Sequence, residues 1–93
     1  MMENKIKAIL EEGRCIKEFE NEARVKFVVP DVKSTIPITP SELWEKVHKG
    51  EIDGHLVTYD KNKDFWICTC TAWNYGIPCS HVEASKRLKD VIA

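Results

Sequence analysis

The sequence predicts a small α+β domain with short antiparallel strands, arranged as hairpins, and two to three helices. Its 93 residues are 43% hydrophobic and 31% charged, which suits a single globular domain. Apolar and polar residues alternate in several short segments, as strands with one buried face require. Two capping-box sequences, at residues 39–42 and 80–83, each predict the start of a helix.

The N-terminal half predicts one helix and a pair of strands. Residues 3–12 carry apolar side chains at helical spacing, and Gly13 follows as a stop signal. Residues 14–20 and 23–29 have the composition of strands, with a turn at residues 21–22. These segments therefore favour a helix followed by a hairpin.

The middle of the chain predicts a connector and a second helix. Three prolines fall between residues 30 and 40, which is typical of an irregular segment or an edge strand. Thr39 is the expected N-cap of a short helix that runs to about Lys49, with proline at its first position. Ile38 and Leu43 have the spacing of a hydrophobic staple across this helix start.

The C-terminal part predicts a second hairpin and a last helix. The hairpin consists of residues 55–59 and 64–68 and turns about residues 61–63. The last helix is expected from His81 to about Val91. Its apolar side is formed by Val82, Leu88 and Val91 or Ile92.

Three cysteines and a histidine beside this helix have the spacing C-x-C, eight residues, C-x-H, which is typical of a closed tetrahedral zinc site. Two thiolates on one zinc lie roughly 3.7 Å apart, so the C-x-C pair belongs where a strand ends and curls. Residues two apart in a helix point to nearly opposite faces, so Cys79 should precede the helix, with Ser80 as N-cap. Accidental spacing and disulfide pairing are the alternatives. The predicted ligands of one structural zinc, between the hairpin end and the C-terminal helix, are Cys68, Cys70, Cys79 and His81.

This segment resembles the SWIM zinc finger, whose pattern is C-x-C, a variable gap and C-x-H. The resemblance covers about residues 55–92, and the Gly-Ile-Pro-Cys step at residues 76–79 strengthens it. It implies that the same four residues bind the metal. Members of the family occur in SWI/SNF-like ATPases, Mutator-type transposases and recombination accessory proteins. The resemblance therefore implies binding to DNA or to protein partners, and no catalysis by the finger.

The charge of the chain differs from that of a non-specific nucleic-acid binder. The formal net charge is −1, without a strongly basic footprint. Many SWIM fingers carry lysine where this chain has Ser80, so one phosphate contact is lost. Basic residues gather only at the tip of the second hairpin and on the last helix, where a solvated helix face is the alternative interpretation. The expected contacts to nucleic acid or a partner are Lys61, Lys63, Tyr75, Lys86, Arg87 and Lys89.

Three further residues have the chemistry of a site. Cys15 is expected to be a buried strand residue, with a redox thiol as the alternative. No thiol or carboxylate pattern joins His48 to His55, so we expect surface or hairpin histidines and no second metal site. Large aromatic residues in so small a domain are expected to cover the zinc site and the last helix, with base stacking as the alternative. These aromatic residues are Trp66 and Trp73.

The sequence as a whole predicts a non-catalytic zinc-binding module, acting as an interaction or regulatory protein in DNA transactions. Its expected partner is a protein of DNA repair, recombination or transcription, or DNA itself, and no small-molecule substrate. A metal-regulated thiol switch or a zinc-dependent enzyme is the alternative, although four protein ligands fill the position that a catalytic zinc leaves open. No apolar stretch reaches the length of a membrane span, so we expect an intracellular protein, cytoplasmic or nucleoid-associated. Residues 1–54 should pack on the finger, residues 55–93, as one domain overall.

Overall fold

The computed structural model describes residues 2–31 and 38–92, and of residues 90–92 the backbone alone. The α+β class is confirmed, with four antiparallel strands and four helices in these ranges. The elements, in chain order, are α1 (Met2–Glu11), β1 (Ile16–Glu20), β2 (Arg24–Pro30), α2 (Pro40–His48), β3 (Gly54–Asp60), β4 (Phe65–Cys68), α3 (Thr71–Asn74) and α4 (Ser80–Ile92).

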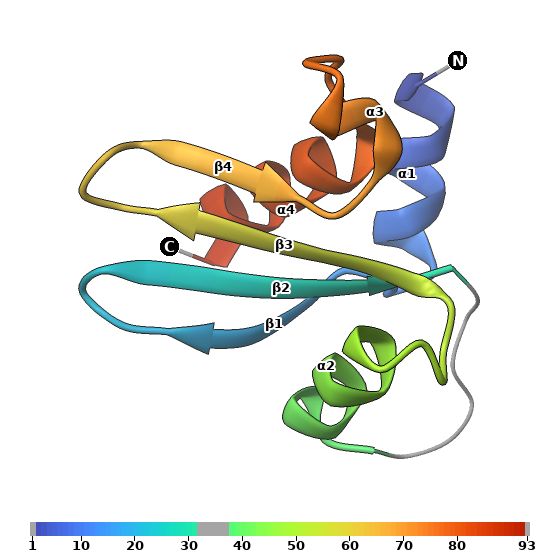
Figure 1. The fold of residues 1–93 in the computed structure, drawn as a ribbon. Coiled ribbons are helices and arrows are strands. Elements are labelled where there is room, and N and C mark those ends of the chain that lie inside the picture. The colour runs from blue at the N-terminus through green and yellow to red at the C-terminus, as the bar shows by residue number, and fades with distance from the viewer. Residues whose placement is uncertain (1, 32–37, 93) are drawn as a thin grey trace.

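The four strands form one antiparallel sheet in the order β1-β2-β3-β4 (Figure 1). β2 and β3 pair along their whole length, from Arg24 opposite Asp60 to Pro30 opposite Gly54. The sheet thus runs without interruption across residue 54, and it joins the two halves of the chain. A Cβ atom on Gly54 would lie 2.7 Å from the Cα atom of Pro30, so this close approach of the two strands requires glycine.

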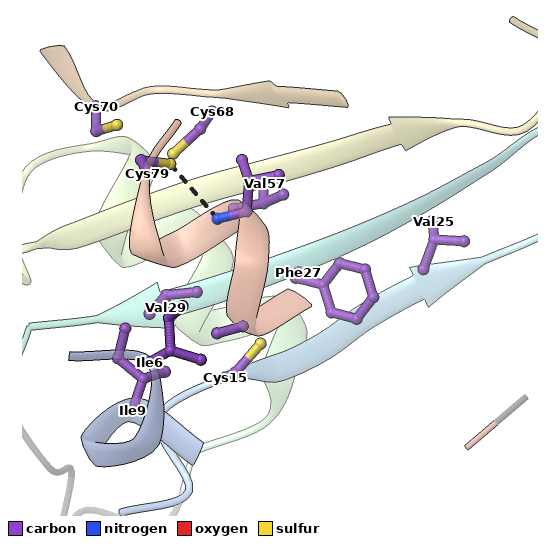
Figure 2. Close-up of a cluster of buried hydrophobic side chains, with 12 residues drawn as sticks. Ile6, Ile9, Cys15, Val25, Phe27, Val29, Val57, Cys68, Cys70 and Cys79 are labelled. Carbon is purple, nitrogen blue, oxygen red and sulfur yellow. Dashed lines mark hydrogen bonds between the residues drawn. The ribbon is translucent and has the colours of Figure 1, made fainter. Parts of the chain in front are cut away.

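Helices α1 and α4 pack together on one face of the sheet (Figure 1). Alternate strand residues point to this face because successive side chains of a strand lie on opposite sides. The largest side chain of the resulting core is Phe27, which is fully buried (Figure 2). The buried core residues on this face are Ile6, Ile9, Cys15, Val25, Phe27, Val29, Val57, Cys68, Cys70, Cys79, Val82 and Ala84.

Helix α2 covers part of the opposite face of the sheet (Figure 1). Val28, Leu43 and Leu56 form a second buried cluster there, and Ile38 packs against it. Ile38 and Leu43 therefore share one apolar cluster, as the staple spacing predicts. The hydroxyl of Thr39 accepts a hydrogen bond from the backbone N–H of Glu42 at 3.1 Å, which confirms Thr39 as the N-cap.

The ends of the other predicted helices and strands lie within two residues of their ends in the structure, a usual difference for such boundaries. Gly13 ends α1 with a φ of 66°, a left-handed backbone angle that glycine adopts readily. Two expectations lie outside the described parts of the chain. One is the path of the connector over residues 32–37, and the other is the contribution of the Val91 and Ile92 side chains to the last helix.

Two local features differ from the sequence-based expectations. Residues 71–74 form the short helix α3, which is not among the elements predicted from the sequence. The residue at the N-cap of α4 is Cys79, so the assignment to Ser80 is wrong. The carbonyl of Cys79 accepts the first helical hydrogen bond, from Glu83 N–H at 3.2 Å, and the helix begins at Ser80.

The dimensions of the molecule fit one compact unit. The radius of gyration of the Cα atoms is 12.4 Å, close to the value of about 12 Å expected for a folded domain of this length. None of the described helices has the length and apolar composition needed to cross a membrane.

Candidate metal centre

Four donor atoms from two short stretches of the chain, residues 68–70 and 79–81, converge at one end of the sheet. Cys68 is the last residue of β4, Cys70 precedes α3, Cys79 precedes α4 and His81 lies in the first turn of α4. Their sulfur and nitrogen atoms all lie within 4.8 Å of one another, and the three thiols are buried. All four cysteines of the chain are free thiols, so the disulfide alternative finds no support.

The curl between Cys68 and Cys70 has a specific cause at Thr69. The backbone N–H of Thr69 still donates to the carbonyl of Leu56 on β3, at 3.2 Å. The backbone N–H of Leu56 donates to the Thr69 hydroxyl at 3.1 Å. In a regular antiparallel pair it would donate to the Thr69 carbonyl. The strand therefore ends at Cys68, and the chain turns so that both thiols face the same point.

Two of the thiols cap helices. Cys70 Sγ accepts a hydrogen bond from the backbone N–H of Trp73 at 3.4 Å, at the start of α3. Cys79 Sγ accepts one from the backbone N–H of Val82 at 3.5 Å, at the start of α4 (Figure 2). Backbone N–H groups and the positive end of a helix both favour a negatively charged sulfur. For Cys79, the hydrogen bond from Val82 lowers the pKa of the thiol, against the larger effect of burial.

His81 presents Nδ1 to the thiols. Nδ1 lies 3.9 Å from Cys68 Sγ, close to the separation of about 3.6 Å that two donors have on a tetrahedral zinc. Burial lowers the pKa of His81 to about 4, and His55 beside it acts in the same direction. The imidazole is therefore neutral at pH 7, which is the form that binds metal.

The protonation of the thiols completes the chemistry of the site. Burial raises the pKa of Cys68 and that of Cys79, because the charged thiolate loses its hydration. The neighbouring sulfurs raise the pKa of Cys68 further. Without a cation, Cys68 and Cys79 hold their protons at neutral pH, and a divalent ion would replace those protons. A buried set of three sulfurs and one imidazole nitrogen fits zinc, which prefers tetrahedral sulfur and nitrogen ligands.

Aromatic residues and a buried serine surround the donors. Trp66 and Trp73 pack against the core cluster that contains the three thiols, as expected. Trp66 stacks on Tyr59, with ring centroids 4.5 Å apart. The hydroxyl of Ser85 donates to the carbonyl of His81 at 2.8 Å, and it contacts Cys15 Sγ at 3.6 Å. Cys15 is buried, as the sequence predicts, but it lies just before β1 and not within a strand. Burial raises the pKa of its thiol to about 11.

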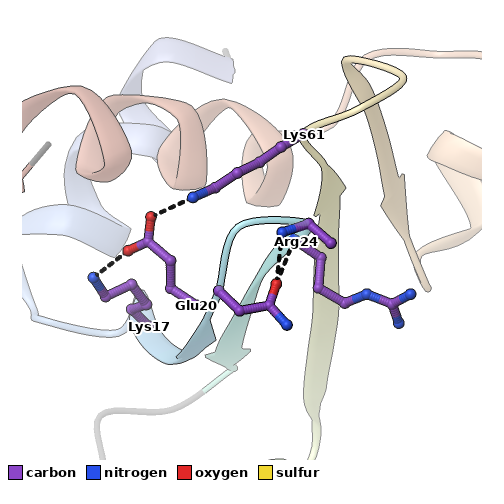
Figure 3. A network of polar contacts seen from close by, with 6 residues as sticks. Lys17, Glu20, Arg24 and Lys61 are labelled. Atoms are coloured by element: carbon purple, nitrogen blue, oxygen red, sulfur yellow. Dashed lines mark hydrogen bonds and ion pairs between the residues drawn. The ribbon is translucent and has the colours of Figure 1, made fainter.

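The basic residues expected to contact a partner lie at the far end of the sheet and along α4, and most of them have acidic or aromatic neighbours. Lys61 pairs with the Glu20 carboxylate at 2.9 Å, and Glu20 also pairs with Lys17 on β1 (Figure 3). Both Nη atoms of Arg87 donate to the Glu3 carboxylate at 2.7 Å. Lys63 is exposed at the hairpin turn.

The remaining candidates are on α4 and in the loop between the ligand pairs. Lys86 pairs with Glu83 at 3.3 Å and lies 5.9 Å from the ring centre of Trp66. Lys89 lies 5.1 Å from the ring centre of Tyr59. Tyr75 is 78% exposed, so its ring is free to meet another molecule.

Sequence reasoning missed the setting of His55. The ring of His55 stacks on the ring of His81, with centroids 3.9 Å apart and an angle of 16° between the planes. Asp31, at the end of β2, joins these two histidines in a second group of donors within 4.8 Å of one another. The hairpin register was the available signal, because pairing of Val57 with Cys68 puts His55 on the same face as the thiols. His48 is exposed at the end of α2.

Comparison with known proteins gives one match. Residues 55–89 match the family model of the SWIM zinc finger, that is, 35 of the 93 residues. Searches of curated proteins and of solved structures gave no match. The matched segment contains β3, β4, α3 and nearly all of α4, together with the three thiols and His81. The comparison therefore shows that residues 55–89 of this chain are similar to the SWIM zinc finger.

Proposed function

We propose that this chain is a non-catalytic zinc-binding module that acts through a protein partner in DNA recombination, repair or transcription. The observation that carries the proposal is the convergence of three buried thiols and His81 within 4.8 Å. A single zinc ion held by these residues would join the end of β4 to the starts of α3 and α4. The ion would thereby fix the loop between the ligand pairs, residues 71–78, as part of the surface.

A structural role fits the donor set better than catalysis. A catalytic zinc normally has three protein ligands and one open position for water or substrate. Here four protein donors, Cys68, Cys70, Cys79 and His81, would complete the tetrahedral shell. We therefore assign the metal to folding and surface presentation, and we place the module inside the cell, in the cytoplasm or at the nucleoid, where thiols stay reduced.

The surface near the finger supports a protein partner. Tyr75 is 78% exposed and Ile77 is 56% exposed, both in the loop between the two ligand pairs. Exposed aromatic and aliphatic side chains are typical of the centres of protein interfaces. The ion pairs of two basic candidates also support this choice, because Arg87 is bound to Glu3 and Lys61 to Glu20.

One arrangement favours direct binding of DNA as the second candidate. Lys86 and Lys89 lie over the rings of Trp66 and Tyr59, respectively. Cations beside aromatic rings are common where single-stranded nucleic acid binds, because bases stack on the rings and phosphates meet the charges. This arrangement makes α4 the surface to test for DNA.

Fluorescence anisotropy of the zinc-loaded chain with single- and double-stranded oligonucleotides, at two salt concentrations, distinguishes the candidates. If the partner is a protein, binding of the oligonucleotides should be weak and should not depend on Lys86 and Lys89. Salt-sensitive micromolar binding that is lost in Lys86→Glu/Lys89→Glu would make DNA the direct ligand. Lys46→Glu/Lys49→Glu is the matched control, since it makes the same charge change at α2 on the opposite face of the sheet.

The protein-partner proposal has its own readout. Zinc-loaded chain, mixed with nuclease-treated extract, should retain a protein of recombination, repair or transcription, identified by mass spectrometry. Tyr75→Ala/Ile77→Ala should lose that protein and keep its zinc, because both side chains are exposed. Equal retention by this variant would overturn the assignment of the loop as the interface.

A further inference from the structure

The histidine ligand of the candidate metal centre is held in an unusual environment. His81 projects from the first turn of α4, and His55 projects from the beginning of β3. Their rings stack nearly parallel, at 3.9 Å and 16°. Packing on one face of the ring therefore restricts the direction in which His81 Nδ1 points.

Asp31 approaches the same two rings from the end of β2. Its carboxylate and a ring nitrogen of each histidine lie within 4.8 Å of one another. The backbone of Asp31 is fixed at both its polar atoms. Its N–H donates to the carbonyl of Asp53 at 2.9 Å, and its carbonyl accepts from Arg14 Nη1 at 3.3 Å. The close packing of Gly54 on Pro30 sets the spacing between the strand ends that carry Asp31 and His55.

The position of Nδ1 assigns the roles of the two nitrogens of His81. Nδ1 faces Cys68 Sγ at 3.9 Å, so it is the atom directed at the metal. In a neutral imidazole bound through Nδ1, the proton is on Nε2, and that N–H needs an acceptor. Asp31 is the carboxylate near this ring, and its negative charge raises the pKa of His81 against the larger effect of burial.

A second metal ion held by Asp31, His55 and His81 is a poorer explanation of the same group. His81 would have to give one nitrogen to each ion, and it would lose both ring protons. Burial lowers the pKa of His55 as well as that of His81, so both rings are neutral and stack without charge repulsion. Among the described residues, the buried Nδ1 of His55 has no hydrogen-bond partner, and the ring packs on the ring of His81.

We propose that Asp31 and His55 are positioning residues for the metal ligand His81: Asp31 accepts a hydrogen bond from Nε2–H of His81, and His55 fixes the plane of its ring by stacking. This inference rests on the proposed zinc site. Partners of this kind commonly raise metal affinity by about 10–100-fold, because they fix the tautomer and the orientation of the ligand. The segment before β3 thus contributes to a metal site whose ligands all lie after residue 67.

The test measures zinc affinity by competition with a chromophoric chelator. We expect Asp31→Ala and His55→Ala each to lower the affinity by about 10–100-fold. Asp31→Asn, which keeps an acceptor oxygen, should fall between Asp31→Ala and the wild type. His55→Phe, which keeps a flat ring, should stay near the wild type. Asp53→Asn is the matched control, because it removes a carboxylate charge from the neighbouring turn, and it should change the affinity less than twofold.

A spectroscopic readout separates positioning from a general loss of stability. In ¹⁵N-edited NMR of the zinc-loaded wild type, the Nε2–H proton of His81 should be visible and protected from exchange. In Asp31→Ala this proton should exchange rapidly, although Nδ1 still binds the metal. Asp31→Asn and His55→Phe keep the size of the original side chains, so they serve if the alanine variants do not fold.

The possible failures are distinguishable. If His81→Ala binds zinc as tightly as the wild type, the proposed zinc site itself is wrong. If His81→Ala loses zinc while Asp31→Ala, His55→Ala and Asp53→Asn bind it equally well, the zinc site stands and the positioning role is overturned. An unprotected Nε2–H proton in the wild type would also overturn the role of Asp31.

Discussion

Local features of the chain position each donor of the metal centre. Cys68 ends a strand whose pairing is altered by the Thr69 hydroxyl, and Cys70 and Cys79 each accept a hydrogen bond at the start of a helix. His81 is kept neutral by burial. These features bring the four donors together, and burial keeps His81 in the neutral form that binds zinc.

We expect zinc binding to release about three protons per ion near pH 7, one from each thiol. Free thiols are largely protonated at this pH, and burial raises the pKa of Cys68 and Cys79 further. His81 contributes no proton, because its pKa is lowered to about 4. As the pH falls toward 5, protons compete for the thiolates, and the affinity should fall by about 1,000-fold per pH unit. Isothermal titration calorimetry in buffers of different ionisation enthalpy measures the number, and release of fewer than two protons would contradict this protonation scheme.

Cys15 should react differently from the other three cysteines. Its side chain is buried against Ser85, and burial raises its pKa to about 11, so it is a poor nucleophile at neutral pH. Iodoacetamide at pH 8 should modify no cysteine in the zinc-loaded protein and should modify Cys68, Cys70 and Cys79 first after chelation. Mass spectrometry gives the order of modification, and early alkylation of Cys15 in the folded protein would contradict its burial.

The ligand residues were predictable from the sequence, whereas their neighbours were not. Cys68, Cys70, Cys79 and His81 are close in sequence, and metal-ligand spacing is a strong local signal. Asp31 and His55 come to the site only through the pairing of β2 with β3. No local pattern reports such a pairing, since it depends on the register of the whole sheet.

At the scale of the elements, the sequence predicted correctly those strands and helices that depend on neighbouring residues in the chain. The alternation of apolar residues located β2, and the capping box located the start of α2. The start of α4 was misassigned by one residue, because Cys79 uses its sulfur where serine would use its hydroxyl. Helix α3 was missed for the same reason, since its cap is Cys70 and cysteine is not a recognised N-cap signal.

The cap of α2 provides a prediction about stability. Thr39→Ala should lower the free energy of unfolding by about 1 kcal/mol, because the backbone N–H of Glu42 loses its acceptor. Thr39→Ser keeps the hydroxyl and is the matched control, with a stability close to that of the wild type. Urea denaturation of the zinc-loaded protein measures both values. Zinc affinity should be unchanged in each variant, because α2 lies on the face of the sheet opposite the metal centre, and equal stabilities of the two variants would argue against the cap.

At the scale of the whole molecule, the metal centre joins the last helix to the sheet. α4 packs on α1 and on the sheet through Val82, Ala84 and Ser85, and its first turn carries His81. The sequence predicted helices and antiparallel strands, but it did not predict how the helices are layered on the sheet. The placement of α1 against α4, with the pair of Glu3 and Arg87 between them, joins residues far apart in the chain and had no local signal.

Removal of the metal should unfold at least the segment from β4 to α4. A structural zinc contributes an apparent ~10–16 kcal/mol in small finger peptides, while a domain of this length has a net stability of about 5–14 kcal/mol. Chelation should therefore reduce the helical circular dichroism signal and lower the thermal midpoint, and added zinc should restore both. An unchanged spectrum and midpoint in a sample shown to be free of metal would contradict a structural role.

X-ray absorption at the zinc K-edge of the zinc-loaded chain shows directly whether three thiolates and one imidazole hold the ion. We expect three sulfur ligands at about 2.3 Å and one nitrogen ligand at about 2.0–2.1 Å. A shell with two or fewer sulfurs, or with an oxygen ligand from water, would contradict this coordination.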